Sequence, residues 1–237
     1  MSDLLNYTLS DGVATLTMND GKANVMGSPM QDALNAALDR AAADRAIVVL
    51  TGRPGMFSGG FDLKVFKSGD PQAMFKMLTG GARLAHRLLL YPHPVLAVAS
   101  GHAIAMGAFL LQCADVRLGL DQGATVQANE VLIGMTLPHF ALAVCRDRVT
   151  PSHLHQVGGT GQAYTGVAAV GAGLLDEVAP AEGLMAAAQA QVTRLKTIDA
   201  KAFSATKQRL REPVVAAVTR AIDLDIADWS RLVATPA

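Results

Sequence analysis

Two glycine-containing segments, Met56–Leu63 (MFSGGFDL) and Gly101–Phe109 (GHAIAMGAF), carry residue types that can stabilise a developing negative charge. Each follows an apolar, strand-like run and leads into a helix-like pattern, so each can direct unpaired backbone N–H groups toward one negative atom. Preorganised N–H donors stabilise charge that develops on a carbonyl oxygen, and losing one typically costs about 2.7–4 kcal/mol. Either segment alone is more typical of an ordinary glycine turn. Together they predict an oxyanion hole.

A single acidic residue, Glu130, lies in the apolar stretch Ala128–Gly134 (ANEVLIG). Apolar neighbours that remove water from a carboxyl group raise its pKa toward the range useful for proton transfer. A lone glutamate is more often a solvated surface acid, because this residue type is rarely buried. From its own surroundings, Glu130 therefore remains open between a catalytic group and a surface acid.

Composition limits the classes of protein to which the chain can belong. The chain has 237 residues, of which 51% are hydrophobic and 17% charged, which is typical of a well-buried globular protein of one large or two small domains. Its 20 basic and 20 acidic residues cancel, which argues against nucleic acid and against an anionic membrane as partners. Without signal-peptide features or a long apolar run, the sequence predicts a cytoplasmic protein. Cys113 and Cys145 lack metal-type spacing and are expected to be buried free thiols.

Turn and capping signals predict the first elements. Residues 7–18 read as a hairpin with a tight turn at Gly12. A helix is predicted from Ser28, because Pro29 suits the first turn and Gln31 completes a capping box with Ser28.

Strands and helices then alternate. The β-branched run 46–51 predicts a strand buried on both faces, a helix starts at Asp70-Pro71, and strands near 95–98 and 115–118 flank a buried helix from Met106. Repeated βα units place their loops at the carboxyl ends of parallel strands, where α/β proteins usually bind ligands. Both glycine segments fall at such ends, and the predicted fold class is α/β.

Beyond residue 138 the chain reads mostly as helices, with a brief strand near 174–178. The final helix carries an apolar stripe at spacings of three and four: Val215, Val218, Ile222, Ile226 and Trp229. This stripe is expected to pack either on the chain's own core or in a swapped position on a neighbouring subunit, and the sequence favours neither.

The two glycine segments resemble the signatures of the enoyl-CoA hydratase/isomerase superfamily, the crotonases. The chain departs from the first signature, approximately Ala-Phe-Ser/Cys-x-Gly-x-Asp-Leu/Ile, only at Met56. It departs from the second, Gly-x-Ala-x-Gly-Gly-Gly-x-Glu/x, at Ala105 and Met106, and it has Phe109 at the last position, where the hydratases of the family have Glu. Resemblance extends from the hairpin to Thr206-Lys207. It implies a crotonase-like (ClpP/crotonase) fold of repeated ββα units, with a core over 1–195, a helical region over 196–237 available for trimer contacts, and a homotrimer or dimer of trimers.

Carried over residue by residue, the resemblance implies that the backbone amides of Gly59 and Met106 hold the thioester oxygen of an acyl-CoA. The side chain at Met106, where the family has glycine, must turn away from the ligand or narrow the pocket. Further residues implied to contact substrate are Lys22, Ala23, Asn24, Ser58, Gly60, Asp62, Leu63, Phe109 and Lys207. Either lysine has the alternative of being a solvated surface charge. Coenzyme A arrives as part of the substrate, and no separate cofactor or metal is implied.

The acid–base positions are the main departure from the family. Its two-glutamate hydratases place carboxylates where this chain has Phe109 and Glu130, so one carboxylate remains. Moving a double bond needs one group that removes a proton and returns it at a neighbouring carbon, whereas hydration must also orient a water. The sequence therefore favours 3-enoyl-CoA to 2-enoyl-CoA isomerisation through Glu130. Alternatives are a hydratase using Glu130 alone, a non-catalytic acyl-CoA-binding protein and a thioesterase.

Other polar residues are expected to be structural. Asp62 suits a turn that accepts backbone N–H groups, Asp115 stands at a strand entry, and His102 is expected to be packed or hydrogen-bonded. Ser58 with His102 imitates a nucleophile and base, but neither lies in a Gly-x-Ser-x-Gly elbow. The glycines of 158–173 do not follow a strand as a nicotinamide-binding fingerprint requires.

Overall fold

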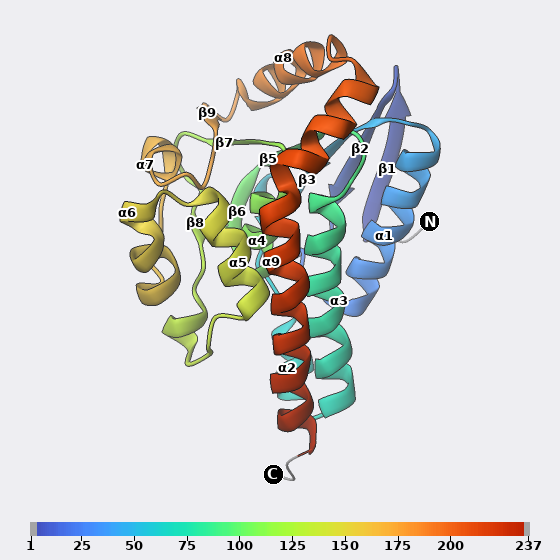
Figure 1. Ribbon diagram of the computed structural model, residues 1–237. Helices are drawn as coiled ribbons and strands as arrows, with labels where there is room; N and C mark the ends of the chain where they lie inside the picture. The colour runs from blue at the N-terminus through green and yellow to red at the C-terminus, as the bar shows by residue number, and fades with distance from the viewer. Residues whose placement is uncertain (1–3, 235–237) are drawn as a thin grey trace.

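The computed structural model describes residues 4–234, which form two β-sheets covered by helices (Figure 1). The larger sheet has the order β1-β2-β3-β5-β7-β9, with bounds Leu5–Ser10, Val13–Met18, Ile47–Thr51, Val95–Ala99, Val116–Leu120 and Glu177–Ala179. The smaller sheet has the order β4-β6-β8, with bounds Gly55–Ser58, Gly101–Ile104 and Val126–Gln127. Only the β1–β2 pair is antiparallel among these described strands.

The predicted hairpin and central strands are confirmed. β1 and β2 pair from Leu5↔Met18 to Ser10↔Val13, and their turn places Asp11 and Gly12 at φ 48° and 71°. A two-residue turn with positive φ at both positions has a backbone twist that fits the right-handed twist of the two flanking strands. The hairpin thereby starts the sheet that the parallel strands extend.

The larger sheet is buried on both faces. Along β5, Val95, Ala97 and Ala99 belong to the main core, whereas Leu96 and Val98 belong to a second cluster with Leu184, Ala188 and Val192 of α8 (Leu184–Lys196). This period-two alternation is the property of a strand with helices on both sides. The main-core side carries α1 (Ser28–Ala43), α3 (Pro71–Leu89), α4 (Met106–Cys113) and α5 (His139–Arg148).

The glycine segments begin as strands, which the sequence did not predict. β4 and β6 are the first residues of these segments, and they pair in parallel from Gly55↔Gly101. A Cβ on Gly101 would lie 1.8 Å from the carbonyl carbon of Gly55, so only glycine permits this close backbone approach. Four-residue strands rich in glycine carry too little alternation to be recognised from a pattern.

The capping box predicted at Ser28 does not form. Gly27 is the N-cap of α1 and contributes no side-chain cap. Gln31 instead lies buried, and its Nε2 donates to the carbonyl oxygens of Met26 and Met77 at 2.9 Å each. The Gln31 side chain thus bonds the Met77 carbonyl on α3 instead of its predicted capping partner, Ser28. The helix predicted to start at Asp70-Pro71 is confirmed, and the Asp70 carboxylate caps it by accepting the N–H groups of Gln72 and Ala73.

The remaining short helices are α2 (Leu63–Lys67), η1 (Glu130–Ile133), α6 (Pro151–Leu154), η2 (His155–Gly159) and α7 (Gly166–Gly171). Those that follow residue 138 confirm the predicted helical character of this part of the chain, and the brief strand predicted near 174–178 is β9, a few residues further along. Across residues 4–234, no helix combines the length and apolar character needed to cross a bilayer.

The last helix, α9 (Ala200–Ala234), packs on its own chain. It lies along α3 and α5, and its Val214, Val218, Ala221 and Trp229 join the main core (Figure 1). Of the two predicted placements, the chain's own core is the one observed here. The division of the chain near residue 196 and its trimeric assembly stay predictions.

One carboxylate on α9 caps the start of α5. Asp225 is 2% exposed, and its two oxygens accept the N–H groups of His139 and Phe140 at 2.8 Å each. The first amides of a helix have no partner within it, so this side chain supplies from another helix what an N-cap normally supplies locally.

Replacing Asp225 by alanine is expected to lower the free energy of unfolding by about 1–3 kcal/mol, because the buried N–H of Phe140 and the partly buried N–H of His139 lose their acceptors. Urea denaturation measures the change. Asp228→Ala on the same helix is the control: its side chain is 49% exposed, and a shift within about 0.5 kcal/mol is expected there. Equal effects of the two substitutions would contradict the capping role of Asp225.

Candidate active site

The small sheet brings the main candidates to one edge. Gly59 directly follows β4, Met106 lies two residues beyond β6, and Glu130 lies three residues beyond β8. The three strands are parallel neighbours, with Ala103↔Val126 and Ile104↔Gln127 in register. Carboxyl ends of parallel strands meet at one edge, so residues far apart in sequence converge there.

The two glycine segments touch through backbone. Gly60 has φ 90°, and a Cβ on it would lie 2.7 Å from Ala105 Cβ and 3.3 Å from the Met106 nitrogen. A Cβ on Gly107 would lie 2.5 Å from the Ser58 carbonyl oxygen. Both positions need glycine because the contact leaves no room for a side chain. The predicted convergence of the two segments is therefore observed.

The free amide of the first segment belongs to Phe61, a correction to the expectation that it belongs to Gly59. The Gly59 N–H donates to Ala23 O at 2.7 Å, and the Gly60 N–H donates to Ser58 Oγ at 3.2 Å. Within residues 4–234, the Phe61 N–H donates to no acceptor. The signature locates the loop, but it does not distinguish among three consecutive amides, whose use depends on partners distant in sequence.

Hydrogen bonding also fixes the direction of the Phe61 N–H. The Gly60 carbonyl oxygen, in the same peptide unit, accepts the Met26 N–H at 2.7 Å. The C=O and N–H of a trans peptide point in opposite directions, and the described chain contains no cis peptide. Because Met26 anchors the carbonyl on one side, the Phe61 N–H points to the other.

The second free amide is that of Met106, as predicted. Ala105 caps α4 with φ 50° and ψ −124°, a backbone conformation that costs a non-glycine residue about 1–3 kcal/mol. Its carbonyl accepts the Phe109 N–H at 3.1 Å, which leaves the Met106 N–H pointing out of the helix start. That N–H has no acceptor in the described part of the chain.

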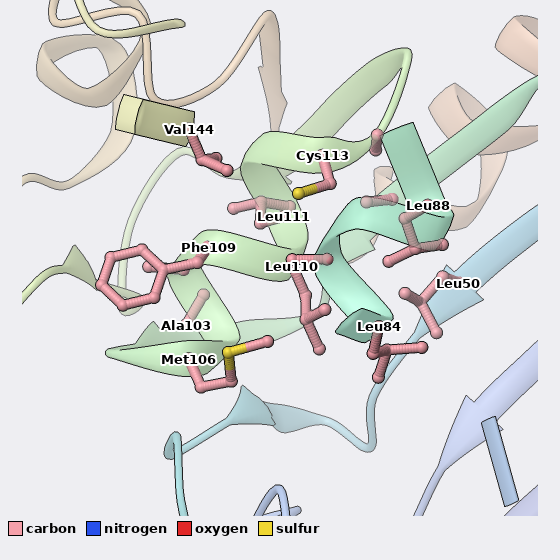
Figure 2. Packing of buried hydrophobic residues seen from close by; sticks show 14 of the residues in the cluster. Leu50, Leu84, Leu88, Ala103, Met106, Phe109, Leu110, Leu111, Cys113 and Val144 are labelled. Carbon is pink, nitrogen blue, oxygen red and sulfur yellow. The ribbon is translucent and has the colours of Figure 1, made fainter. Parts of the chain in front are cut away.

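The Met106 side chain lies in the core. It is 0% exposed, and its Sδ lies 3.4 Å from where a Cβ on Gly81 of α3 would lie. Figure 2 shows Met106 beneath α4, with Phe109 leaving the helix on one side and Leu110 on the other, toward Leu84. The methionine therefore packs toward α3, while its backbone amide remains free.

Glu130 is a buried acid without a partner for one oxygen. It is 5% exposed, it begins η1, and its Oε2 has no hydrogen-bond partner in the described residues. Burial raises the pKa of its carboxyl from 4.5 to about 7. The surface-acid alternative is therefore wrong, and the carboxyl is placed in the range suited to a general base.

Aromatic side chains stand where the family's first carboxylate would be. Phe109 is 1% exposed, and its ring meets that of Phe140 on α5 edge-on, with centroids 6.0 Å apart. Cys145, also on α5, has a thiol whose pKa is raised by burial and by the charge of Glu130. Cys113 and Cys145 are free and buried, as predicted.

The turn before α1 is held by its own polar groups. Asn24 has φ 49°, is buried, and its Nδ2 donates to the carbonyl oxygens of Met18, Met56 and Phe57. Ser58 Oγ donates to Asn24 O at 2.7 Å, so this hydroxyl is engaged in the turn. Lys22 is exposed beside it. Contacts of Lys22, Ala23 and Asn24 with substrate stay predictions.

Several polar residues have the structural roles expected of them. Asp62 caps α2 by accepting the Lys64 N–H at 2.9 Å, next to the half-exposed Leu63. Asp115 accepts the N–H of Val95, the first residue of β5, at 2.9 Å. Within residues 4–234, no three His, Cys, Asp or Glu side chains gather as a metal site requires.

Lys207 is not brought to the glycine segments. Its Nζ lies 2.7 Å from Asp115 Oδ2, and the lysine is only 6% exposed. Asp115 precedes β7 and bonds the start of β5, so this ion pair stands at the amino ends of the strands, away from the candidate edge. The solvated alternative is wrong for Lys207, because Asp115 holds its ammonium inside the protein, and its contact with a CoA phosphate stays a prediction.

The comparison with known proteins decides the family. The family model for enoyl-CoA hydratase/isomerase matches residues 8–235. The chain belongs to this family. Its fold is that of the crotonases: probable enoyl-CoA hydratase ECHA3 from Mycobacterium tuberculosis superposes with a TM-score of 0.93 and 42% identity, over 97% of this chain and 98% of that one.

Relatives in this family are named for two reactions. A second structure of the M. tuberculosis protein, described as an enoyl-CoA isomerase, is 43% identical with a TM-score of 0.90, over 96% of this chain and 99% of that one. A probable enoyl-CoA hydratase from Rhodobacter capsulatus is 34% identical over 130 residues, which are 52% of this chain and 49% of that protein. The chain thus spans about half the length of that curated relative. Which reaction occurs must be argued from the site.

The raised pKa of Glu130 predicts a pH-dependent cost to stability. Between pH 4.5 and about 7 the unfolded carboxyl loses its proton while the folded one keeps it, so stability falls as pH rises through this window. The cost levels off above it, at about 3 kcal/mol in order of magnitude. We expect Glu130→Gln to match the wild type near pH 4 and to gain unfolding free energy relative to it by pH 8, measured by urea denaturation.

The exposed Glu182→Gln is the matched control for this measurement. Its stability is expected to follow the wild type at every pH. A Glu130→Gln variant whose difference from the wild type does not change with pH would show that the folded carboxyl ionises normally.

Proposed function

We propose that this protein isomerises 3-enoyl-CoA thioesters to 2-enoyl-CoA thioesters. The observation that supports this proposal is a single buried carboxyl, Glu130, at the edge of the small sheet where two backbone amides are also free of acceptors in the described residues, with the buried Phe109 in place of the family's other carboxylate. In this scheme the Phe61 and Met106 amides receive the thioester oxygen, and the acyl carbons lie toward Glu130.

The reaction needs one group that both takes and returns a proton. The Glu130 carboxylate removes a proton from C2, and the electrons of that C–H bond shift toward the thioester oxygen, giving a dienolate that the two amides stabilise. Protonated Glu130 then returns the proton to C4, and the double bond between C3 and C4 moves to C2 and C3. A pKa near 7 suits both halves, because the group must accept and release a proton at similar cost.

Hydration is the second candidate, and one observation favours it. Asn129 Oδ1, adjacent in sequence to Glu130, is buried without a partner in the described residues. A carboxamide oxygen that accepts a hydrogen bond could hold a water for Glu130 to activate. Against this, the first family carboxylate is replaced by Phe109, which removes a polar partner that an ordered water needs. Isomerisation is therefore the stronger proposal.

Replacing Glu130 by glutamine tests the proposed base. We expect isomerisation of a 3-enoyl-CoA to fall by about 10²- to 10⁴-fold in kcat, the usual contribution of a positioned acid–base group. The assay follows the absorbance of the conjugated product, with Glu182→Gln as the control expected to retain activity. Undiminished turnover in Glu130→Gln would eliminate this residue as the base.

The same preparation separates the alternatives. Hydration of crotonyl-CoA that exceeds isomerisation would favour the hydratase, and release of free CoA would favour a thioesterase. Tight binding of CoA esters with no turnover on a broad acyl panel would favour a non-catalytic acyl-CoA-binding protein.

The pH dependence of the reaction gives a separate prediction. The base must be ionised, so kcat/KM is expected to rise with pH and to reach half of its plateau near pH 7, the pKa of Glu130 in the free protein. Steady-state rates from pH 5 to 9 with a short 3-enoyl-CoA measure this profile. A profile that is flat between pH 5 and 8 would contradict Glu130 as the base.

A further inference from the structure

Helix α3 carries two adjacent glycines in its interior, Gly80 and Gly81. Glycine destabilises a helix interior relative to alanine, so such a pair calls for a local reason. A Cβ on Gly81 would lie 2.5 Å from Phe61 Cε1 and 2.7 Å from Phe61 Cζ, and it would also contact Met106 Sδ at 3.4 Å. The Phe61 ring therefore occupies the space that a side chain at position 81 would fill.

The two side chains that meet at Gly81 belong to the two residues with free amides. Phe61 is 9% exposed and Met106 is 0% exposed, so each is held in the main core. Interiors are close-packed, and a displaced ring must carry its own backbone or push its neighbours. The distance between the Phe61 and Met106 N–H groups consequently depends on how closely the two glycine segments approach α3.

Gly80 lies close to a residue that is connected by hydrogen bonds to the peptide between Gly60 and Phe61. A Cβ on Gly80 would lie 2.2 Å from Gln31 Oε1. Gln31 Nε2 donates to the carbonyl oxygens of Met77 on α3 and of Met26. The Met26 N–H in turn holds the Gly60 carbonyl, whose peptide unit includes the Phe61 N–H. The glycine pair thus lets α3 approach both the Phe61 ring and Gln31, which bonds the residue that orients the Phe61 peptide.

We propose that Gly81 is a positioning residue for the oxyanion hole, acting through the Phe61 ring that it seats. This inference rests on the proposed function, because it assumes that the Phe61 and Met106 amides receive a thioester oxygen. A methyl group at position 81 displaces the ring, shifts the Phe61 N–H relative to the Met106 N–H, and weakens their joint stabilisation of the enolate. Misplacement of a catalytic group by about 1 Å is enough to cost about a hundredfold in rate.

The test compares Gly81→Ala with Gly81→Ala combined with Phe61→Leu. Leucine keeps the backbone amide but lacks the ring atoms Cε1 and Cζ that a new methyl group would meet. We expect Gly81→Ala to lower kcat for 3-enoyl-CoA isomerisation by about tenfold to a hundredfold, with KM within about threefold, because the lost interaction forms in the transition state. The double variant should recover kcat to within about threefold of Phe61→Leu alone.

A spectroscopic readout distinguishes positioning from general damage. An aryl-conjugated enoyl-CoA absorbs at longer wavelength when its carbonyl is polarised, so its shift on binding should shrink in Gly81→Ala and return in the double variant. Gly171→Ala on α7 is the matched control, since a Cβ there meets nothing within 4 Å. Its kcat and its spectral shift should equal those of the wild type.

Two outcomes overturn the inference: wild-type kcat and spectral shift in Gly81→Ala, or a loss above about tenfold that persists in the Phe61→Leu background. If Gly81→Ala does not fold, the double variant is compared with Phe61→Leu, where equal kcat supports the inference and a tenfold loss overturns it. A wild-type protein that neither binds nor polarises the enoyl-CoA would instead refute the proposed function, which keeps the two failures distinct.

Discussion

The candidate active site depends on one close approach of backbone to backbone. Gly60 lies against Ala105 and the Met106 nitrogen, and Gly107 lies against the Ser58 carbonyl, with no side chain between the two segments. This contact holds two unpaired amides near each other before any ligand arrives. Strain at Ala105 is tolerated because the surrounding strands and helices determine its conformation. A preorganised pair of donors needs no reorganisation during reaction, which is the physical basis of oxyanion stabilisation.

The two free N–H groups point as they do because the carbonyl oxygen of each one's own peptide unit is held by a hydrogen bond on the opposite side. The Met26 N–H anchors the Gly60 carbonyl, and the Phe109 N–H anchors the Ala105 carbonyl. The core behind them is apolar and close-packed, with Phe61 and Met106 seated on α3. Burial also raises the pKa of Glu130. An apolar environment therefore serves both parts of the proposed reaction, the stabilisation of negative charge by the amides and the proton transfer by Glu130.

Buried polar contacts hold the larger sheet and the last helix in place. Asp115, Lys207 and Arg211 form a buried ionic cluster where β7 begins, and Asp225 caps α5 from α9. A carboxylate that bonds backbone amides or a buried cation is costly to disrupt, because its partners would be left unsatisfied. These contacts hold the last helix on the chain's own core, and α5 in turn places Phe140 against Phe109. Lys207 and Asp115 thus belong to the contacts that hold the larger sheet and α9, whereas Glu130 and the glycine segments gather at the carboxyl edge of the smaller sheet.

The sequence by itself determined the local features: the Asp11-Gly12 hairpin, the buried strands predicted at 46–51 and 95–98, the helix start at Asp70, and two glycine segments that follow strand-like runs. The family resemblance singled out Glu130, but its apolar neighbours Val131, Leu132 and Ile133 are exposed, so the burial of this carboxyl comes from the rest of the fold. Tertiary structure alone decided the use of groups whose partners are distant in sequence. Gly59 gives its amide to Ala23, Gln31 leaves its capping box for Met77, and Lys207 pairs with Asp115. Each outcome depends on a hydrogen-bond or ion-pair partner from another element, and neither residue type nor spacing carries that information.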